Sequence, residues 1–186
     1  RRILAFPYPV DGFYYSAFFA LLLKLVGELS LPTAQWVWGL LQVALAAALA
    51  VIPIRGWLKL AGWRLVLYVL LFATSIPLLH NFKWGQVSVL VTLSVLASLQ
   101  AHGSRRDTAA GIWLAFGVAI KYYVAWFVFY YLIRRQWRVL LAFSAAVIGF
   151  LVVVPSLVLG PVVTYQFHRE AYDNLAAASS LIAQDW

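Results

Sequence analysis

The feature that most constrains this chain is a series of apolar runs, each close in length to a membrane-spanning helix. Hydrophobic residues make up 65% of the sequence and charged residues only 11%. Such a chain has too little polar surface to coat a soluble domain. The runs approach the ~20 residues that a spanning helix requires, and they lack the alternating pattern of a barrel strand. The sequence therefore predicts an all-α fold, a polytopic transmembrane helix bundle.

Nothing in the sequence divides this bundle into parts. No internal repeat, heptad pattern or low-complexity linker is present, so residues 1–186 are predicted to form a single membrane domain. The chain begins at Arg1, contains no methionine and stops after an alanine-rich stretch, and we interpret it as a fragment of a longer protein. The absence of cysteine excludes disulfides, thiolate catalysis and Cys-ligated metal. No metal site and no cofactor are predicted.

The basic residues indicate topology. The net charge of +8 does not point to nucleic acid, because the positive residues stand at the ends of apolar segments and not on a polar surface with stacking aromatics. By the positive-inside rule, three basic clusters are cytoplasmic. They are Arg55, Lys59 and Arg64; Arg105 and Arg106; and Arg134, Arg135 and Arg138.

These clusters set the direction of the other segments. Residues 35–54 are expected to run inward, and residues 65–79 to rise to the outer side, where Ile76-Pro77 would end the helix. Residues 80–86 would then form a polar outer turn, and residues 87–101 would return to the cytoplasm.

The two ends of the chain are less regular. Residues 139–159 are expected to cross outward, and Gly160-Pro161 to open an outer loop. Residues 13–27 either span the membrane or form a partial helix in the outer interface, and the sequence leaves both open.

Lys121 is the only charge between Asp107 and Arg134, and it is surrounded by apolar and aromatic residues. An ionised side chain at membrane depth costs roughly 2.5–3.5 kcal/mol on insertion scales. Lys121 is therefore a functional candidate, a cation that would bind an anionic ligand. The alternative is a lysine that snorkels to a headgroup or neutralises a structural partner.

The backbone around Lys121 is also unusual. Residues 109–133 start and end at cytoplasmic arginines but are too few for two full crossings. We therefore predict short or broken re-entrant helices with Lys121 at the apex, an arrangement tolerated only where it is buried in protein or lines a wet cavity. The alternative is one straight span with an arginine pair on the unexpected side, since the positive-inside rule is a bias.

The segment from Asn81 to Gln86 concentrates polar chemistry between two apolar helices. It contains two amides, the ammonium of Lys83 and the indole of Trp84, next to a glycine that allows close backbone approach. A binding site is one interpretation. The other is that Trp84 belongs to the aromatic belt of the membrane while Asn81 and Gln86 cap helix ends.

Two segments of the chain, NFKWGQVSVLVTLSVLA and RRDTAAGIWLAFGVAIKYYVAWFVFYYLIRRQWRVLLAF, closely resemble the core of the glycosyltransferase 87 family of bacterial GT-C membrane proteins. The shared features are Gly85-Gln86 and Ala110-Gly111 at helix starts, the interrupting Lys121 and the basic turn at residues 134–138. The stretch Phe6-Pro7-Tyr8-Pro9 is similar to the family's Tyr-Pro-rich entry. Tyr122-Tyr123 departs from the commoner proline neighbourhood after the lysine.

The resemblance implies a transferase that moves mannose, or another hexose or pentose, from a polyprenyl-phosphate donor to a lipid-linked or cell-envelope acceptor. The active site would face outward from the bacterial plasma membrane. An apolar tail that ends in an anion requires an apolar groove with cations near its mouth. We therefore predict a donor-phosphate site of Lys121, Lys83, Gln86 and Asn81, and we expect the two lysines and Gln86 to converge on one outward-opening cavity.

The other catalytic groups are less defined. GT-C enzymes carry a catalytic aspartate in the first outer loop, which would lie upstream of this fragment, so the fragment alone is expected to be inactive. Asp11 is the one acid near that end, either a candidate base or a turn residue before Gly12. His168 and Arg169 either contact the acceptor sugar or belong to a solvated amphipathic helix. The alternative function is a membrane transporter or lipid flippase, which also places charges on broken helices.

Overall fold

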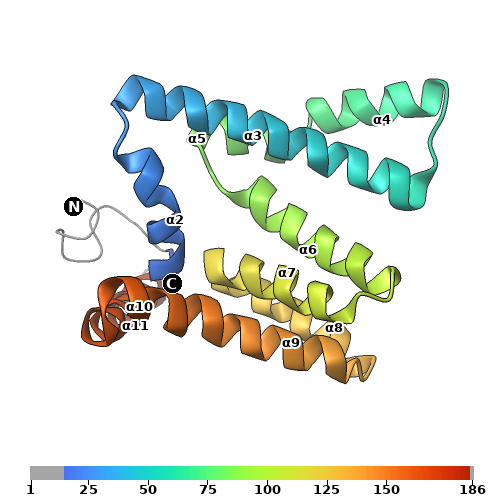
Figure 1. Ribbon diagram of the computed structural model, residues 1–186. Helices are drawn as coiled ribbons and strands as arrows, with labels where there is room; N and C mark the ends of the chain where they lie inside the picture. Colours follow the sequence, from blue (N-terminus) through green and yellow to red (C-terminus); the bar gives the residue numbers. More distant parts are fainter. Residues whose placement is uncertain (1–14, 185–186) are drawn as a thin grey trace.

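The computed structural model describes residues 15–184, with side-chain surroundings for residues 15–173. Within these residues every regular element is helical and there is no β-strand, which confirms the all-α prediction (Figure 1). In chain order the elements are α2 (Ala17–Gly27), α3 (Leu31–Pro53), η1 (Ile54–Leu58), α4 (Trp63–Ala73), α5 (Ile76–Trp84), α6 (Ser88–Gly103), α7 (Asp107–Ile120), η2 (Tyr122–Phe127), α8 (Val128–Ile133), α9 (Trp137–Ile148), η3 (Gly149–Val153), α10 (Val154–Leu159) and α11 (Pro161–Gln184).

Two continuous helices in the described part are long and apolar enough to cross a membrane. They are Leu31–Leu58, with 28 residues, and Trp137–Leu159, with 23. A third candidate is the pair Trp63–Ala73 and Ile76–Trp84, bent by 42°. The two long helices bury little of their apolar surface inside the protein, as expected where lipid covers it. The prediction of a polytopic membrane protein is confirmed.

The bend between α4 and α5 corrects one expectation. The helix that begins at Trp63 ends at Ala73, before Pro77, and Pro77 lies in the first turn of the new helix α5, where its missing N–H is not needed. The residues from His80 to Trp84 are therefore helical. The predicted polar turn is wrong for these residues and correct only from Gly85, whose φ of 58° ends the helix in the left-handed region.

The segment around Lys121 is broken as predicted. Helix α7 ends at Ile120, Lys121 is extended with φ −136° and ψ 117°, and the chain continues through η2 into α8. Figure 1 shows that α8 runs back alongside α7, so that the turn before α7 and the turn after α8 lie at the same end of the bundle. The re-entrant arrangement is confirmed, and the straight-span alternative is wrong.

The three basic clusters consequently lie at the same end of the bundle. The α3–α4, α6–α7 and α8–α9 connections are all on the right-hand side of Figure 1. One cavity is lined by Trp57, Gly103 and Arg134, which come from these three regions. We call this the arginine end, and the opposite end, where α7 stops at Lys121, the lysine end.

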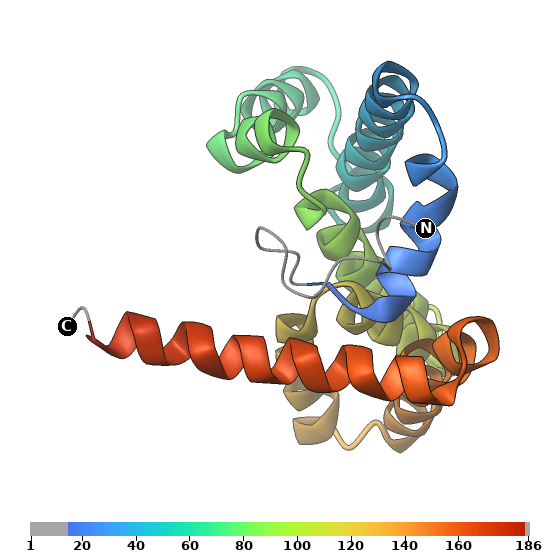
Figure 2. The same ribbon diagram turned by 90° about the vertical axis from the view of Figure 1, so that its left-hand side faces the viewer.

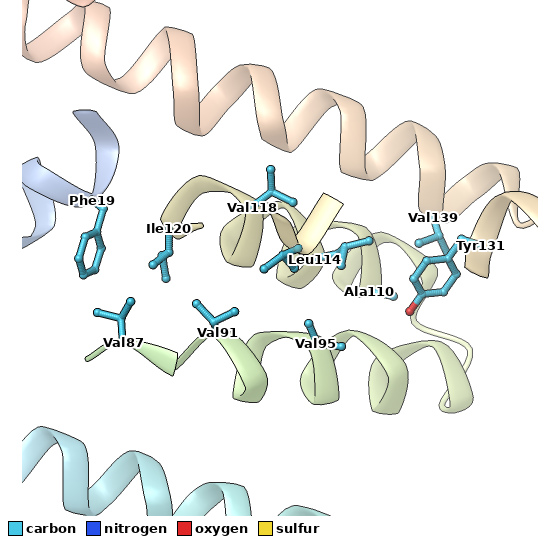
Figure 3. Close-up of a cluster of buried hydrophobic side chains, with 11 residues drawn as sticks. Phe19, Val87, Val91, Val95, Ala110, Leu114, Val118, Ile120, Tyr131 and Val139 are labelled. Atoms are coloured by element: carbon cyan, nitrogen blue, oxygen red, sulfur yellow. The ribbon is translucent and has the colours of Figure 1, made fainter. Parts of the chain in front are cut away.

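Helix α7 is the centre of the bundle, and eight of its fourteen residues are buried. Glycines allow its neighbours to come close: a Cβ at Gly111 would lie 2.5 Å from the carbonyl oxygen of Val139 on α9, and one at Gly117 would collide with Ser94 on α6. The apolar core forms around it (Figure 3). The buried core residues are Phe19, Val87, Val91, Val95, Ala110, Leu114, Val118, Ile120, Val124, Tyr131 and Val139.

Helix α2 lies across the lysine end (Figure 1). At 11 residues and 1.5 Å per residue it is too short to span a membrane, so the partial-helix alternative describes this segment. Ser16 caps its start by accepting from the N–H of Phe19, and the Ser16 hydroxyl donates to the carbonyl of Ala119. Because the helix break at Lys121 removes the regular donor for that carbonyl, Ser16 at the start of α2 replaces it.

The segment after Gly160 is a helix and not the expected outer loop. Pro161 begins α11, a helix of 24 residues that extends away from the bundle in Figure 2. His168 connects α11 to η3, since its Nε2–H donates to the carbonyl of Leu151 at 2.8 Å. That carbonyl lacks its usual α-helical donor because residue 155 is proline.

The close packing of α7 against α9 leads to a test of the fold. We expect Gly111→Leu to destabilise the protein by about 1–3 kcal/mol, since the new side chain must push the two backbones apart. Gly39→Leu on α3 is the matched control, because an added Cβ there meets no atom within 4 Å. Unfolding in detergent, followed by circular dichroism, compares the two. Equal stability of both variants would contradict the close approach.

Candidate functional site

Lys121 lies at the lysine end, partly buried, at the point where α7 stops. Its Nζ is 5.7 Å from the ring centroid of Tyr15 and 5.8 Å from that of Tyr123. Within residues 15–173 the ion pairs are His102 with Asp107 and Arg169 with Asp173, so no described carboxylate neutralises Lys121. Aromatic faces attract a cation without removing its charge, which leaves the ammonium able to bind an anion.

The local backbone explains why the lysine is presented at this point. The N–H of Lys121 still bonds to the carbonyl of Gly117 at 2.9 Å, and its carbonyl accepts from Val124 at 3.2 Å. The chain therefore turns within one residue while keeping these backbone groups satisfied, as burial in a membrane protein requires. The C-terminal end of α7 also carries partial negative charge, which stabilises a cation there.

An apolar groove of about 380 Å³ lies beside Lys121 and shares Tyr15 with it. The groove runs between α2, the start of α3 and the turn that follows α5. Its lining residues are Tyr15, Phe19, Leu23, Val26, Gly27, Ala34, Gln35, Trp38, Gly85 and Val87. The wall is almost entirely apolar, so the groove suits a hydrocarbon chain better than a sugar.

The wall at Gly85 is fixed by a tryptophan. The indole Nε1–H of Trp38 donates to the carbonyl of Gly85 at 3.1 Å. A Cβ at Gly85 would lie 3.4 Å from that nitrogen, and the positive φ disfavours any other residue. The Gly-Gln pair noted in the sequence is therefore a backbone feature of the groove wall.

Asn81 has a role that its sequence position did not reveal. Its side chain is buried: Nδ2 donates to Oε1 of Gln42 at 3.0 Å, and Oδ1 accepts from the N–H of Val89 at 3.3 Å. Gln42 in turn donates from Nε2 to the carbonyl of Gln86. This buried amide network holds the turn between α5 and α6. Sequence reasoning missed Gln42, although an amide in the middle of the apolar helix α3 was a visible signal.

Lys83 and Gln86 are both exposed. The Nζ of Lys83 lies 5.4 Å from the ring centroid of Trp84, and Oε1 of Gln86 accepts from the hydroxyl of Ser88 at 3.3 Å. The groove is lined both by Gly85, which follows the helix of Lys83, and by Tyr15, whose ring lies near Lys121. Neither lysine is itself among the lining residues. Their convergence on one phosphate stays a prediction.

The remaining candidates lie elsewhere. Asp11 is outside the described residues. His168 bonds to the carbonyl of Leu151 in η3, and Arg169 is exposed and pairs with Asp173 at 3.8 Å along the same helix. These contacts agree with an amphipathic helix, and they leave contact with an acceptor as a prediction.

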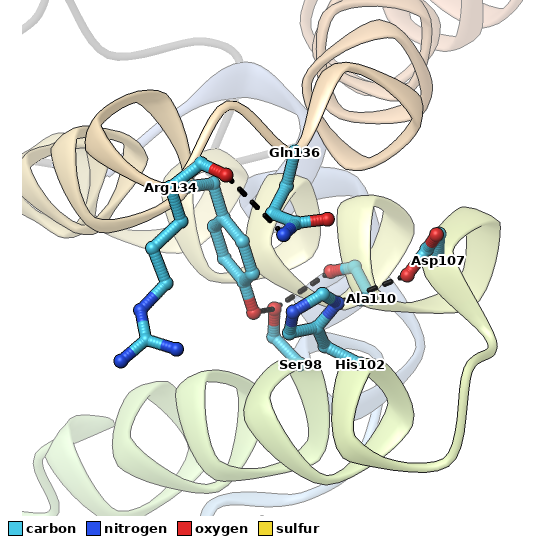
Figure 4. A network of polar contacts seen from close by, with 7 residues as sticks. Ser98, His102, Asp107, Ala110, Arg134 and Gln136 are labelled. Carbon is cyan, nitrogen blue, oxygen red and sulfur yellow. Dashed lines mark hydrogen bonds and ion pairs between the residues drawn. The ribbon is translucent and has the colours of Figure 1, made fainter.

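A second polar cluster stabilises the re-entrant hairpin of α7 and α8 at the arginine end (Figure 4). The hydroxyl of Ser98 lies 2.8 Å from both the carbonyl oxygen of Ala110 and the hydroxyl of Tyr131. His102 packs edge-on against Tyr131 and bonds to Asp107 at 2.9 Å. The cluster joins α6, α7 and α8 at the end of the bundle opposite Lys121.

The fold and the site together define a membrane helix bundle with a lysine-bearing re-entrant segment. Residues 13–185, almost the whole chain, match Glycosyltransferase family 87. The chain belongs to this family and is a membrane glycosyltransferase, as its resemblance to the family predicted. Comparison with curated proteins and with solved structures gave no match.

The amide network generates a prediction about stability. Gln42→Leu should lower the free energy of unfolding by about 1–3 kcal/mol, because the buried Asn81 amide and the Gln86 carbonyl each lose a partner. Gln35→Leu, at an exposed position on the same helix, serves as the control and should change little. Thermal unfolding in detergent measures both. A Gln42→Leu variant as stable as the control would rule out the structural role of the network.

Proposed function

We propose that the lysine end binds a polyprenyl-phosphate sugar and transfers mannose, or another hexose or pentose, to a lipid-linked or cell-envelope acceptor. The observation that carries the proposal is the position of Lys121: an ammonium without a described carboxylate partner, beside an apolar groove. A polyprenyl phosphate combines the two complementary features, a hydrocarbon tail and a terminal anion. Membership of a glycosyltransferase family favours this reading over a transporter or flippase.

The tail and the phosphate would use different parts of the site. The groove between α2 and α3 would hold the first part of the prenyl chain, and the phosphate would lie at its mouth, where Tyr15 brings Lys121 close. Lys83 lies at the end of α5, and Gln86 lies in the turn that follows, where Gly85 forms part of the groove wall. Asn81 would act through that turn by holding its backbone in place.

The reaction explains why a cation is needed. An acceptor hydroxyl oxygen forms a bond to the anomeric carbon while the bond from that carbon to the phosphate oxygen breaks. The bonding electrons leave with the polyprenyl phosphate, which gains negative charge in the transition state. A positioned ammonium stabilises that developing charge by several kcal/mol at most in a site of low dielectric constant.

The proton of the acceptor hydroxyl requires a general base. Asp11, or an aspartate upstream of this chain, is the proposed base, and His168 and Arg169 are the proposed contacts on the acceptor side. By the positive-inside rule the arginine end is cytoplasmic, so the lysine end would face outward from a bacterial plasma membrane.

The proposal is tested in the full-length protein that contains this chain. Lys121→Ala should abolish most sugar transfer from a polyprenyl-phosphate donor while leaving the membrane yield unchanged, because it removes a partly buried charge and no described ion pair. Lys121→Arg should restore only part of the activity, since a guanidinium keeps the charge but not the compact geometry of an ammonium. Donor turnover and membrane yield are measured side by side.

The exposed Lys24 on α2 supplies a matched control. Lys24→Ala removes one lysine at an exposed position that does not line the groove, and it should retain normal turnover. If Lys121→Ala transfers sugar as well as Lys24→Ala does, the lysine is structural and the donor site lies elsewhere.

A further inference from the structure

The arginine end has a large excess of positive charge. Between His102 and Arg138 the chain contains five arginines but one acidic residue, Asp107. That carboxylate already bonds to Nδ1 of His102 at 2.9 Å. No described carboxylate lies within ion-pair distance of any of the five arginines, so their counterions must come from outside the described chain.

One of these arginines lines a cavity. Arg134 extends from the end of α8, and its guanidinium carbon lies 4.9 Å from the ring centroid of Tyr130, while Figure 4 shows its side chain apart from the bonded pair of His102 and Asp107. The cavity measures about 530 Å³. Its walls come from η1, α6 and α8, and its lining residues are Trp57, Leu99, His102, Gly103, Tyr130 and Arg134.

The chemistry of this lining is amphipathic. Leu99 and the faces of Trp57 and Tyr130 are apolar, and Trp and Tyr rings are enriched where the hydrocarbon of a membrane meets its headgroups. Arg134 adds a fixed fork of N–H donors that matches a phosphate in shape and charge. Cavities of this kind, basic and placed between helices at the positively charged end, suit the headgroups of anionic lipids.

We propose that this cavity binds the phosphate of an anionic phospholipid, with Arg134 as the phosphate ligand and Trp57, Leu99 and Tyr130 against the upper part of the acyl chains. The lipid would supply the counterion that the protein lacks at this end. Because the cavity joins η1 to α6 and to the end of α8, a bound lipid would also stabilise the re-entrant segment from the end opposite Lys121. The site is separate from the proposed donor site and does not depend on it.

The experiment measures lipid binding by the purified full-length protein in neutral detergent, with phosphatidylglycerol as the probe and native mass spectrometry as the readout. Arg134→Ala should weaken phosphatidylglycerol binding roughly tenfold, the effect of losing one charge-assisted phosphate contact. Arg138→Ala is the matched control, since Arg138 belongs to the same cluster but does not line the cavity, and it should bind normally. Phosphatidylcholine and inorganic phosphate should each bind at least tenfold more weakly than phosphatidylglycerol.

A second pair of variants keeps every charge in place. Gly103 lines the cavity and an added Cβ there meets no atom within 4 Å, so Gly103→Leu adds a side chain at the cavity wall without a steric clash and should hinder the lipid. Gly39→Leu, equally unobstructed but on α3 away from the cavity, should leave binding intact.

Four results would overturn the proposal. Equal weakening by Arg134→Ala and Arg138→Ala would show diffuse attraction to the whole basic end, and equal binding of phosphatidylcholine would show that the charge is irrelevant. Inorganic phosphate that binds as well as the lipid would show a site for a soluble anion. Should Arg134→Ala fail to fold, unimpaired binding by Gly103→Leu contradicts the proposal by itself.

Discussion

The rest of the structure depends on the need to satisfy every backbone group of a helix that stops inside the bundle. Helix α7 ends at Ile120, and a broken helix in an apolar environment is stable only if neighbouring groups replace the lost hydrogen bonds. The carbonyl of Gly117 keeps its donor at Lys121, and the carbonyl of Ala119 receives one from Ser16 at the start of α2. The start of the short helix α2 therefore contributes directly to the stability of the broken helix α7. The same requirement explains the bond from His168 to Leu151, where a proline has removed the regular donor.

This arrangement separates the two kinds of basic residue. The hairpin of α7 and α8 returns the chain to the end where it began, so the turns that carry the arginines lie at one end and the break at Lys121 lies at the other (Figure 1). At one end a single ammonium lies beside an apolar groove, and at the other Arg134, one member of a cluster of arginines, lines an amphipathic cavity. A lone cation at a groove is suited to one phosphate of a transferred group, while a cluster of arginines is suited to the anionic surface of a membrane.

Residue type alone did not distinguish the surroundings of the two amides near Gly85. Asn81 and Gln86 are both amides close to a glycine in the sequence. Yet the Asn81 side chain is buried and hydrogen-bonded, whereas Gln86 is exposed. The difference arises because the residues from His80 to Trp84 continue a helix, which turns Asn81 toward Gln42 of α3. Pro77 was expected to end the preceding helix, but a proline is equally compatible with the first turn of a new one. Local rules allow both positions, and the packing of α5 against α3 selects one.

The sequence by itself determined the class of the protein. Apolar composition and run length predicted membrane helices, and the arginines at residues 105 and 134, too close in sequence for two full crossings, favoured a re-entrant segment around Lys121 over one straight span. The family motifs identified a glycosyltransferase. These features are local or additive along the chain, and elementary physical rules therefore predict them from the sequence. Only the tertiary structure decided that α2 crosses the lysine end, that Gln42 holds the turn after α5, and that Trp57 and Arg134 share a cavity. Each of these depends on side chains far apart in sequence, whose contact is set by how helices pack and not by any pattern within one helix.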